Sequence, residues 1–206
     1  MKFSFLALTL LAFIFSCQGQ TSRQEKIVGG PCEGCEAIYE YGDRILKSVD
    51  TLPKFKDSEP KLKLSGTVFQ NDGKTPAADV ILYIYHTNRE GIYETKGNEK
   101  GWARRHGFIR GWVKTEQVGR YTFYTFRPAA YPSGTEPEHI HLTVKEPGKS
   151  AYYLDDFLFE DDPMFTDKIR KTQAKRGGSG IFLPIEKSGV LEIQRDIILG
   201  LNIPGY

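Results

Sequence analysis

Short segments of alternating apolar and polar residues follow one another from about residue 62 to the end of the chain, which is typical of half-buried β-strands. Turn sequences such as NDGKTP and EQVG separate them, and no long segment has apolar residues at helical spacing. The pattern predicts an all-β fold, a β-sandwich with few short helices over residues 62–206. The EQVG turn further predicts that two of the strands pair as a hairpin, 107–115 with 120–126. All the predicted strands lie at 62–70, 78–86, 107–115, 120–126, 138–145, 152–159 and 191–201.

The N-terminal end of the chain has a different pattern. Lys2 precedes the apolar run FSFLALTLLAFIF, which is too short to span a membrane and is typical of a secretory signal peptide. The run ends in IFSC, so the small residue Ser16 directly precedes Cys17, and this resembles a bacterial lipoprotein signal. We therefore expect residues 1–16 to be removed and Cys17 to carry a lipid as the first mature residue. An ordinary cleavage site nearby is the alternative.

In both cases the protein is expected to be exported. With the lipid it would be anchored to a bacterial membrane, at an outer-membrane, periplasmic or surface face. Residues 17–61 would then form a polar tether and an N-terminal lead-in to the sandwich.

Cys32 and Cys35 form a Cys-x-x-Cys pair within this lead-in. In an oxidising compartment such a pair forms a disulfide by default. A redox-active pair would need a thioredoxin-like βαβ context, and a zinc site would need two further ligands nearby. Neither is evident in the sequence. A disulfide is therefore the favoured interpretation, with a redox or metal pair and free thiols as the alternatives.

Charge and length narrow the function classes. The chain has 28 lysines and arginines against 26 aspartates and glutamates, a formal net charge of only +2, and it contains no long basic run. This balance argues against a nucleic-acid partner. The 206 residues are enough for one domain with a substantial core.

Two of the four histidines lie one residue apart in the sequence PEHIHLTV. On a strand, residues i and i+2 face the same side, so His139 and His141 would lie next to each other, opposite Ile140 and Leu142. Two imidazoles at that spacing can reach one metal ion. The alternative is a polar strand face that contains histidines without a ligand.

Two tyrosines lie in loops that flank the predicted strands. Tyr93 follows the strand that ends in ILYIYH, and Tyr131 lies in RPAAYPSG, just before the histidine strand. Loops carry functional residues because a rigid scaffold positions them. A single loop tyrosine more often packs or forms a hydrogen bond, so neither tyrosine alone indicates a site.

Taken in order, motifs across residues 62–163 resemble the catalytic domain of the intradiol ring-cleavage dioxygenases, which include the catechol and protocatechuate dioxygenases. LSGTVFQNDGKTPAADVILYIYH resembles the opening strand, turn and strand of that family, and GIY resembles its Gly-x-Tyr motif. IRGWVKTEQVGRYTFYTFRPAAYP resembles its hairpin and Pro-x-x-Tyr-Pro motif, and EPEHIHLTV its Pro-x-His-x-His motif. Each motif is weakly specific by itself, but all of them in this order over about half of the chain are a strong indication.

The resemblance implies an enzyme that binds one non-haem Fe(III) ion through Tyr93, Tyr131, His139 and His141. It implies a catechol-type aromatic substrate and O2, with ring cleavage between the two hydroxylated carbons and incorporation of both oxygen atoms. Tyr131 would be both a ligand and the acceptor of a substrate proton. Phenolates suit a trivalent ion, because its charge stabilises the ionised form of a group whose ordinary pKa is ~10.

The chain departs from the family pattern at Glu136. The family usually has arginine there, beside the substrate ring, where it stabilises negative charge, so the resemblance makes Glu136 a specificity residue that places turnover and substrate range in question. Arg110, Arg120 or Arg127 would have to take over the role of that arginine from a neighbouring strand. The oligomeric state is left open.

Two other function classes are compatible with parts of the sequence. The segment LSGTVFQNDGKTPAADVILYIY also resembles transthyretin-like binding modules, which are not catalytic and lack the Tyr, Tyr, His-x-His set. A degenerate relative could keep the iron and no longer cleave rings. Iron content separates the first alternative from an enzyme, and turnover separates the second. His86 and His106 match no motif and are expected to be surface or packing residues.

Overall fold

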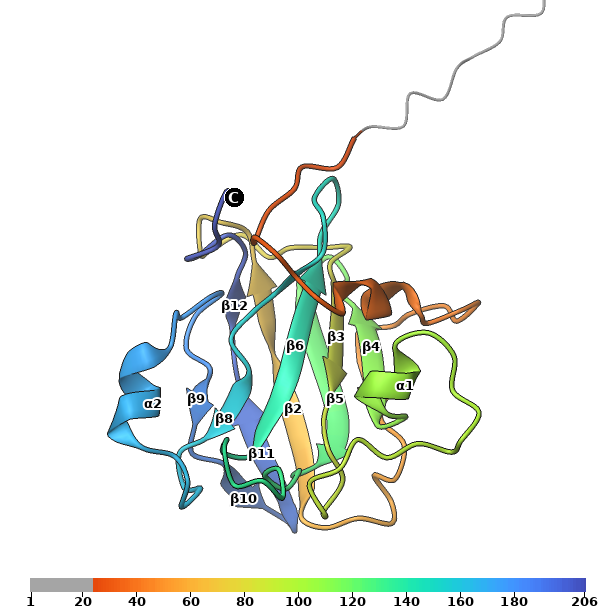
Figure 1. Cartoon of the computed structure of the whole chain (residues 1–206). Helices are drawn as coiled ribbons and strands as arrows, with labels where there is room; N and C mark the ends of the chain where they lie inside the picture. The colour runs from red at the N-terminus through yellow and green to blue at the C-terminus, as the bar shows by residue number, and fades with distance from the viewer. Residues whose placement is uncertain (1–23) are drawn as a thin grey trace, which may run out of the picture.

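The computed structural model describes residues 24–206, so the predicted signal peptide and Cys17 lie outside the described residues. The described chain forms two six-stranded β-sheets with only short helical turns, which confirms the predicted all-β sandwich (Figure 1). Within this part of the chain, none of the helices has the length and apolar composition needed to cross a membrane.

The first sheet has the strand order β1-β5-β2-β11-β10, and β12 also pairs with β2. Its strands are β1 (Val49–Thr51), β2 (Lys61–Phe69), β5 (Arg120–Phe126), β10 (Ile185–Lys187), β11 (Val190–Gln194) and β12 (Ile197–Ile198). The second sheet has the order β4-β3-β6-β8-β9, and β7 also pairs with β6. Its strands are β3 (Ile81–Tyr85), β4 (Arg110–Lys114), β6 (His139–Lys145), β7 (Tyr152–Tyr153), β8 (Phe157–Phe159) and β9 (Ile181–Phe182). The helical elements are η1, a 3₁₀ turn (Cys35–Tyr39), α1 (Ala103–His106) and α2 (Asp167–Thr172).

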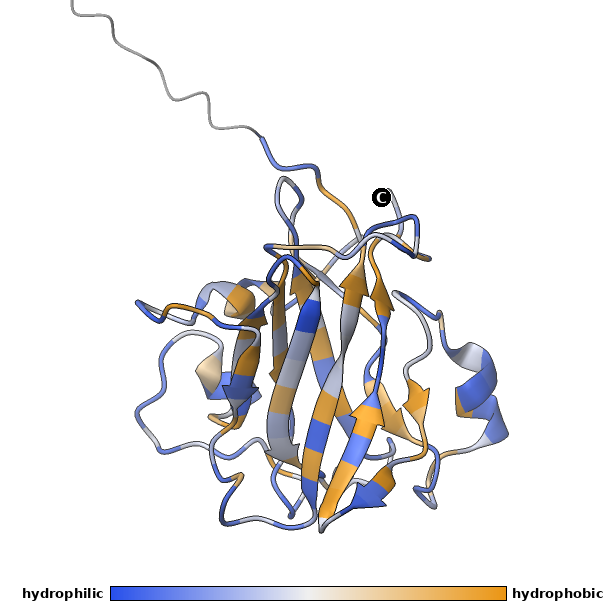
Figure 2. Ribbon diagram, turned by 180° about the vertical axis from the view of Figure 1, so that it is seen from behind, coloured by the Kyte–Doolittle hydropathy of each residue, from blue (hydrophilic) through white to orange (hydrophobic). Residues whose placement is uncertain are grey.

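Strand β6 shows how the alternating pattern places the core. Ile140, Leu142 and Val144 are at most 1 % exposed and belong to the main hydrophobic cluster. The two histidines alternate with them and therefore face away from that cluster, on the outer face of the second sheet. Figure 2 shows the same alternation as orange and blue bands along the strands. Because each buried side chain of this size stabilises the fold by about 1.5–3 kcal/mol, the register of β6 is strongly specified.

The predicted hairpin between 107–115 and 120–126 is wrong. β4 pairs antiparallel with β3, whereas β5 pairs with β2 and β1, so the EQVG turn crosses from one sheet to the other. Val113 of β4 and Phe123 of β5 are fully buried in the same core cluster, one from each sheet. The turn sequence correctly indicates that the chain reverses its direction. It does not specify whether the two strands then pair in one sheet or, as here, pack their apolar faces against each other from two sheets.

Two predicted strands are each divided in two. β7 and β8 replace 152–159, and β11 and β12 replace 191–201. The divisions fall at polar residues, Asp155-Asp156 and Arg195-Asp196. Arg195 is only 2 % exposed, and its Nη1 donates a hydrogen bond to the backbone oxygen of Asp155 over 2.7 Å. This bond fixes the Asp155-Asp156 break relative to the end of β11.

Part of the N-terminal lead-in packs directly on the sandwich. Val28 is 2 % exposed within the main core cluster, and β1 pairs in parallel with β5. Ala37 and Ile38 of η1 are fully buried against side chains of β3 and β4. The segment before residue 62 thus supplies one strand of the first sheet and covers part of the outer face of the second.

Cys32 and Cys35 are joined by a disulfide at the start of η1, with their Cα atoms 5.6 Å apart. The bond closes a loop that contains only Glu33 and Gly34 between the cysteines. Loop-closure stabilisation grows with loop length, so a bond this local contributes little by that route. Its main structural effect is to fix the conformation of this short loop.

Candidate metal centre

Four side-chain atoms converge on the outer face of the second sheet, at the start of β6. Oη of Tyr93 lies 2.5 Å from Oη of Tyr131 and 2.7 Å from Nε2 of His141. Nε2 of His139 lies 3.1 Å from Oη of Tyr131 and 3.2 Å from Nε2 of His141. The structure therefore brings together all four residues that the sequence proposed as ligands.

Each histidine is oriented through its other ring nitrogen. Nδ1 of His139 lies 2.7 Å from the backbone oxygen of Pro137, so this nitrogen carries the proton and donates it. Nδ1 of His141 lies 3.1 Å from Oδ1 of Asp156. Burial lowers the pKa of His139, which keeps its imidazole neutral. With Nδ1 holding the proton of each neutral ring, Nε2 is the nitrogen that offers a lone pair at the point where the four side chains meet.

The two tyrosines meet because their loops pack backbone against backbone. The Thr87 hydroxyl donates to the backbone oxygen of Ala129 over 2.7 Å, and the Ala129 N–H donates to the backbone oxygen of Asn88 over 3.1 Å. Gly91 has φ +74°, and a Cβ at this position would lie 2.1 Å from the backbone oxygen of Ala130. Only glycine allows that approach, which places the Tyr93 loop beside the loop that carries Tyr131.

The spacing and chemistry of the four atoms fit a transition-metal ion. Metal bonds to nitrogen or oxygen of about 2.0–2.1 Å place neighbouring ligand atoms about 3 Å apart, close to the separations here. Burial raises the pKa of both phenols, and for Tyr93 the contact with Tyr131 raises it further, so without a cation both are neutral at pH 7. A bound multivalent cation stabilises phenolates directly and offsets this cost.

Asp156 is a further residue of the site that sequence reasoning missed. Its carboxylate lies with His139 and His141 in a group whose ligand atoms are within 4.8 Å of one another. Burial favours the neutral forms of Asp156 and His141, but their mutual attraction outweighs it, so the pKa of Asp156 is lowered and that of His141 is raised. Because its oxygen contacts Nδ1, Asp156 orients His141 from behind and leaves Nε2 free for a ligand. The only sequence signal was the acidic pair in YLDDF, which interrupts an apolar segment.

We expect Asp156→Asn to weaken metal binding by about 10- to 100-fold, the usual cost of losing an outer partner of a histidine ligand. The amide lacks the charge that fixes the orientation and basicity of the ring. Competition with a chelator of known affinity measures the change. Asp161→Asn is the matched control, because Asp161 pairs with Arg127 and lies outside this group. Equal affinities for Asp156→Asn and the wild type would show that Asp156 does not support the centre.

A cavity of about 390 Å³ opens beside the four atoms. Its lining residues come from the disulfide loop, β3, α1, both tyrosine loops and β6: Glu33, Tyr85, Tyr93, Trp102, Arg105, His106, Tyr131, Glu136 and His141. A larger cleft of about 730 Å³ lies beside Trp112 and contains none of the four converging side chains. The 390 Å³ cavity, which Tyr93, Tyr131 and His141 all line, is therefore the one that a substrate of this centre would enter.

Stacked rings hold His141 in place. Tyr85 stacks on His141 with ring centroids 4.4 Å apart, and His106 stacks on the other side of Tyr85 at 3.8 Å. His106 is thus a packing residue, as expected, but its packing is part of the site. His86 is 1 % exposed, and its Nε2 contacts the Thr125 hydroxyl at 2.7 Å, so it belongs to the interior.

The sequence is similar to those of known dioxygenases. The protein-family model described as dioxygenase matches residues 40–180, which span all four converging residues. The chain belongs to this dioxygenase family. Its curated relatives include the protocatechuate 3,4-dioxygenase beta chain of Burkholderia cepacia, 27% identical over 136 residues that cover 60% of this chain and 57% of the relative. Catechol 1,2-dioxygenase 1 of Acinetobacter lwoffii is 27% identical over 190 residues, which cover 78% of this chain and 59% of that protein. The chain thus spans less than two thirds of the length of either relative.

Solved structures of dioxygenases share the fold. Catechol 1,2-dioxygenase from Acinetobacter sp. ADP1 superimposes with a TM-score of 0.56 at 20% identity, over 73% of this chain and 56% of that one. The dioxygenase domain of a carbohydrate-binding fusion protein from Streptomyces sp. SirexAA-E gives 0.53 at 20% identity, over 77% and 90% of the two chains. An intradiol ring-cleavage dioxygenase from Tetranychus urticae gives 0.51 at 20% identity, over 85% and 93%.

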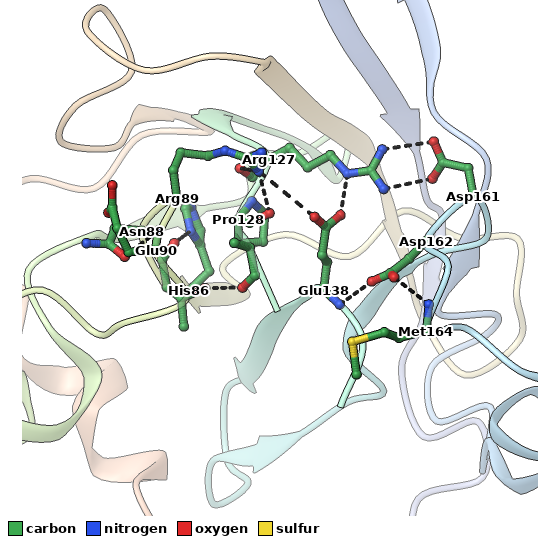
Figure 3. Close-up of polar contacts among 12 residues, drawn as sticks. His86, Asn88, Arg89, Glu90, Arg127, Pro128, Glu138, Asp161, Asp162 and Met164 are labelled. Carbon is green, nitrogen blue, oxygen red and sulfur yellow. Dashed lines mark hydrogen bonds and ion pairs between the residues drawn. The ribbon is translucent and has the colours of Figure 1, made fainter. Parts of the chain in front are cut away.

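None of the three arginines suggested as replacements for the family arginine lines the cavity of this dioxygenase-family chain. Arg127 pairs with Glu138 and with Asp161, at 2.5 Å and 2.8 Å (Figure 3). Arg110 pairs with Glu40 at 2.6 Å, and Arg120 is exposed on β5 of the other sheet. The basic residue that does line the cavity is Arg105 of α1, which has no counterpart among the motifs.

Glu136 does lie at the cavity. Its Oε2 is 4.0 Å from Nε2 of His139, and its side chain is 60% exposed. A carboxylate therefore stands at the mouth of the site, close to the four converging atoms.

Proposed function

We propose that the protein is a non-haem Fe(III) dioxygenase that cleaves a catechol-type ring between its two hydroxylated carbons with O2. The observation that carries the proposal is the meeting of two phenol oxygens and two imidazole nitrogens within 2.5–3.2 Å, beside a cavity, in a chain of the dioxygenase family. Two phenolates would neutralise most of the charge of a ferric ion, and neutral imidazoles add donors without adding charge. This donor set differs from the two-histidine, one-carboxylate set that suits ferrous iron.

When bound, the ferric ion would supply Lewis acidity that makes a bound catechol reactive toward O2. The side chains of this protein have separate tasks. All four converging side chains would hold the ion, with His141 kept in one orientation by Asp156 and by the stacked ring of Tyr85. Tyr131 would accept one proton of the substrate at its Oη, which is 2.5 Å from the oxygen of Tyr93.

The proposal is tested by incubating iron-loaded protein with catechol under ¹⁸O2 and analysing the product by mass spectrometry. Intradiol cleavage adds both atoms of O2 to the catechol and yields a muconic acid, so both labelled atoms should appear in it. Iron-loaded protein that binds catechol and yields no ring-opened product would contradict the enzyme and favour a degenerate relative. Protein that binds no iron would favour a binding module.

The negative charge of Glu136 should make the site prefer catechols without a ring carboxylate. Two like charges ~6 Å apart at an effective dielectric of ~20 repel by about 3 kcal/mol. The 60% exposure of Glu136 reduces this through solvent and salt, so we expect about a tenfold effect. In Glu136→Gln, kcat/KM for protocatechuate should rise about tenfold relative to kcat/KM for catechol. Glu90→Gln, an exposed loop variant outside the cavity, should leave the ratio unchanged. An unmoved ratio in Glu136→Gln would show that the carboxylate does not act on the substrate.

A further inference from the structure

Part of the cavity lining does not belong to the four converging side chains and is formed by Glu33 of the disulfide loop and by Trp102, Arg105 and His106 at α1. These four residues come from two segments that the family motifs do not include: the N-terminal lead-in and the segment between Tyr93 and β4.

The disulfide loop packs directly against α1. Gly34 has φ +87°, and a Cβ at this position would lie 2.9 Å from Nε2 of His106, so the loop backbone lies on the imidazole. His106 is itself fixed, because its Nδ1 lies 2.9 Å from the hydroxyl of Tyr83 and its ring stacks on Tyr85. The loop that carries Glu33 is thus closed by the disulfide and packs against the stacked rings of His106 and Tyr85.

The cavity is lined by one arginine and two glutamates, and the arginine pairs with only one of the two. Among the residues that line it, Arg105 is the only lysine or arginine, and Glu33 and Glu136 are the only acids. Arg105 forms an ion pair with Glu33 through Nη1, and its guanidinium lies 5.4 Å from the centre of the Trp102 ring. Glu136 has no such partner in the cavity. Glu33 consequently neutralises the one lysine or arginine of the lining that would attract an anionic substrate.

We propose that Glu33 is a specificity-determining residue, held by the Cys32–Cys35 disulfide, which masks Arg105 and makes the cavity select catechols without an anionic ring substituent. This rests on the proposed function and extends it, because it assigns a substrate-selecting role to the N-terminal lead-in. Removing the Glu33 charge both frees Arg105 and removes a repulsion, and both changes favour an anionic ligand. The pair is largely exposed, so the effect is moderate and weakens at high salt.

The test uses equilibrium binding of two phenols that are not cleaved, phenol and 4-hydroxybenzoate, to iron-loaded protein by calorimetry. They differ by one carboxylate. In Glu33→Gln the affinity for 4-hydroxybenzoate relative to phenol should rise about fivefold at low salt. Glu36→Gln is the matched control, since it removes the same charge three residues along the chain and outside the cavity, and its ratio should stay at the wild-type value. An unchanged ratio in Glu33→Gln overturns the proposal.

Two further variants test how the effect is transmitted. In an Arg105→Gln background, Glu33→Gln should shift the ratio by less than half as much on a logarithmic scale, because the unmasked cation is gone. If Glu33→Gln shifts the affinity ratio as much in the Arg105→Gln background as in the wild type, Glu33 does not act by masking Arg105. In Cys32→Ser/Cys35→Ser, the loosened loop should raise the ratio in the same direction as Glu33→Gln, and an unchanged ratio overturns the role of the disulfide.

The outcome also separates this inference from the proposed function. If iron-loaded wild-type protein does not open the ring of catechol, the proposed function fails and this inference fails with it. If both phenols bind and catechol is cleaved, but the ratio stays constant in Glu33→Gln, only the specificity role of Glu33 fails.

Discussion

His139→Ala is expected to lose most of the bound metal, with affinity lowered more than 100-fold. This exceeds the 10- to 100-fold typical of outer partners, because the variant removes a ligand atom itself. Nε2 of His139 lies within 3.2 Å of both Tyr131 Oη and His141 Nε2, and the side chain is only 6 % exposed, so the variant removes a buried donor from the middle of the set. Metal content per chain after dialysis, measured by elemental mass spectrometry, reports the change.

His86→Gln is the control for this experiment. His86 is as deeply buried as His139 but contacts Thr125 and the backbone of Thr87, away from the four converging atoms. The His86→Gln variant should have a lower melting temperature and the same metal content as the wild type. Full metal content in His139→Ala would contradict the assignment of His139 as a ligand.

Tyr131→Phe is expected to reduce kcat per bound iron by about 10²- to 10⁴-fold, the usual contribution of a positioned proton acceptor. The variant keeps the ring, which packs edge-on against His139 with centroids 5.0 Å apart, and removes only the oxygen. Activity is therefore compared at equal iron content, which separates loss of proton transfer from loss of metal. The measurement is the initial rate of catechol consumption against the iron concentration of the sample.

Tyr124→Phe makes the same chemical change on β5 of the other sheet, where the ring packs against Phe55. Its rate should stay close to that of the wild type. A rate for Tyr131→Phe within tenfold of the wild type, at equal iron, would exclude Tyr131 as the proton acceptor.

The features that could be predicted from the sequence depend on local pattern. The alternation in PEHIHLTV places His139 and His141 on one face because neighbouring residues of a strand face opposite sides, whatever the strand pairs with. Tyr93 and Tyr131 could be identified only by motif, since their meeting depends on the contact of Gly91 with Ala130 between two loops. A period-two pattern contains no information on that contact.

The features that could not be predicted depend on pairing between distant segments. The crossing of EQVG between sheets is decided by which strands cover the shared core, which the turn residues do not specify. Asp156 reaches His141 because β8 pairs antiparallel with β6, and Arg105 meets Glu33 across 72 positions of the chain. The sequence pattern predicts only a lead-in before residue 62, whereas this segment contributes Glu33 to the cavity of the site.

Ferric iron held by the four converging side chains would be seen in the absorption spectrum of the purified protein and in its metal content. We expect iron in roughly equal amount to the chain and a broad visible band from phenolate-to-Fe(III) charge transfer. Tyr93→Phe should weaken or shift that band, because it removes one of the two phenolates. A colourless protein that carries zinc or no metal, even after reconstitution with ferric iron, would show that these side chains do not form a ferric centre.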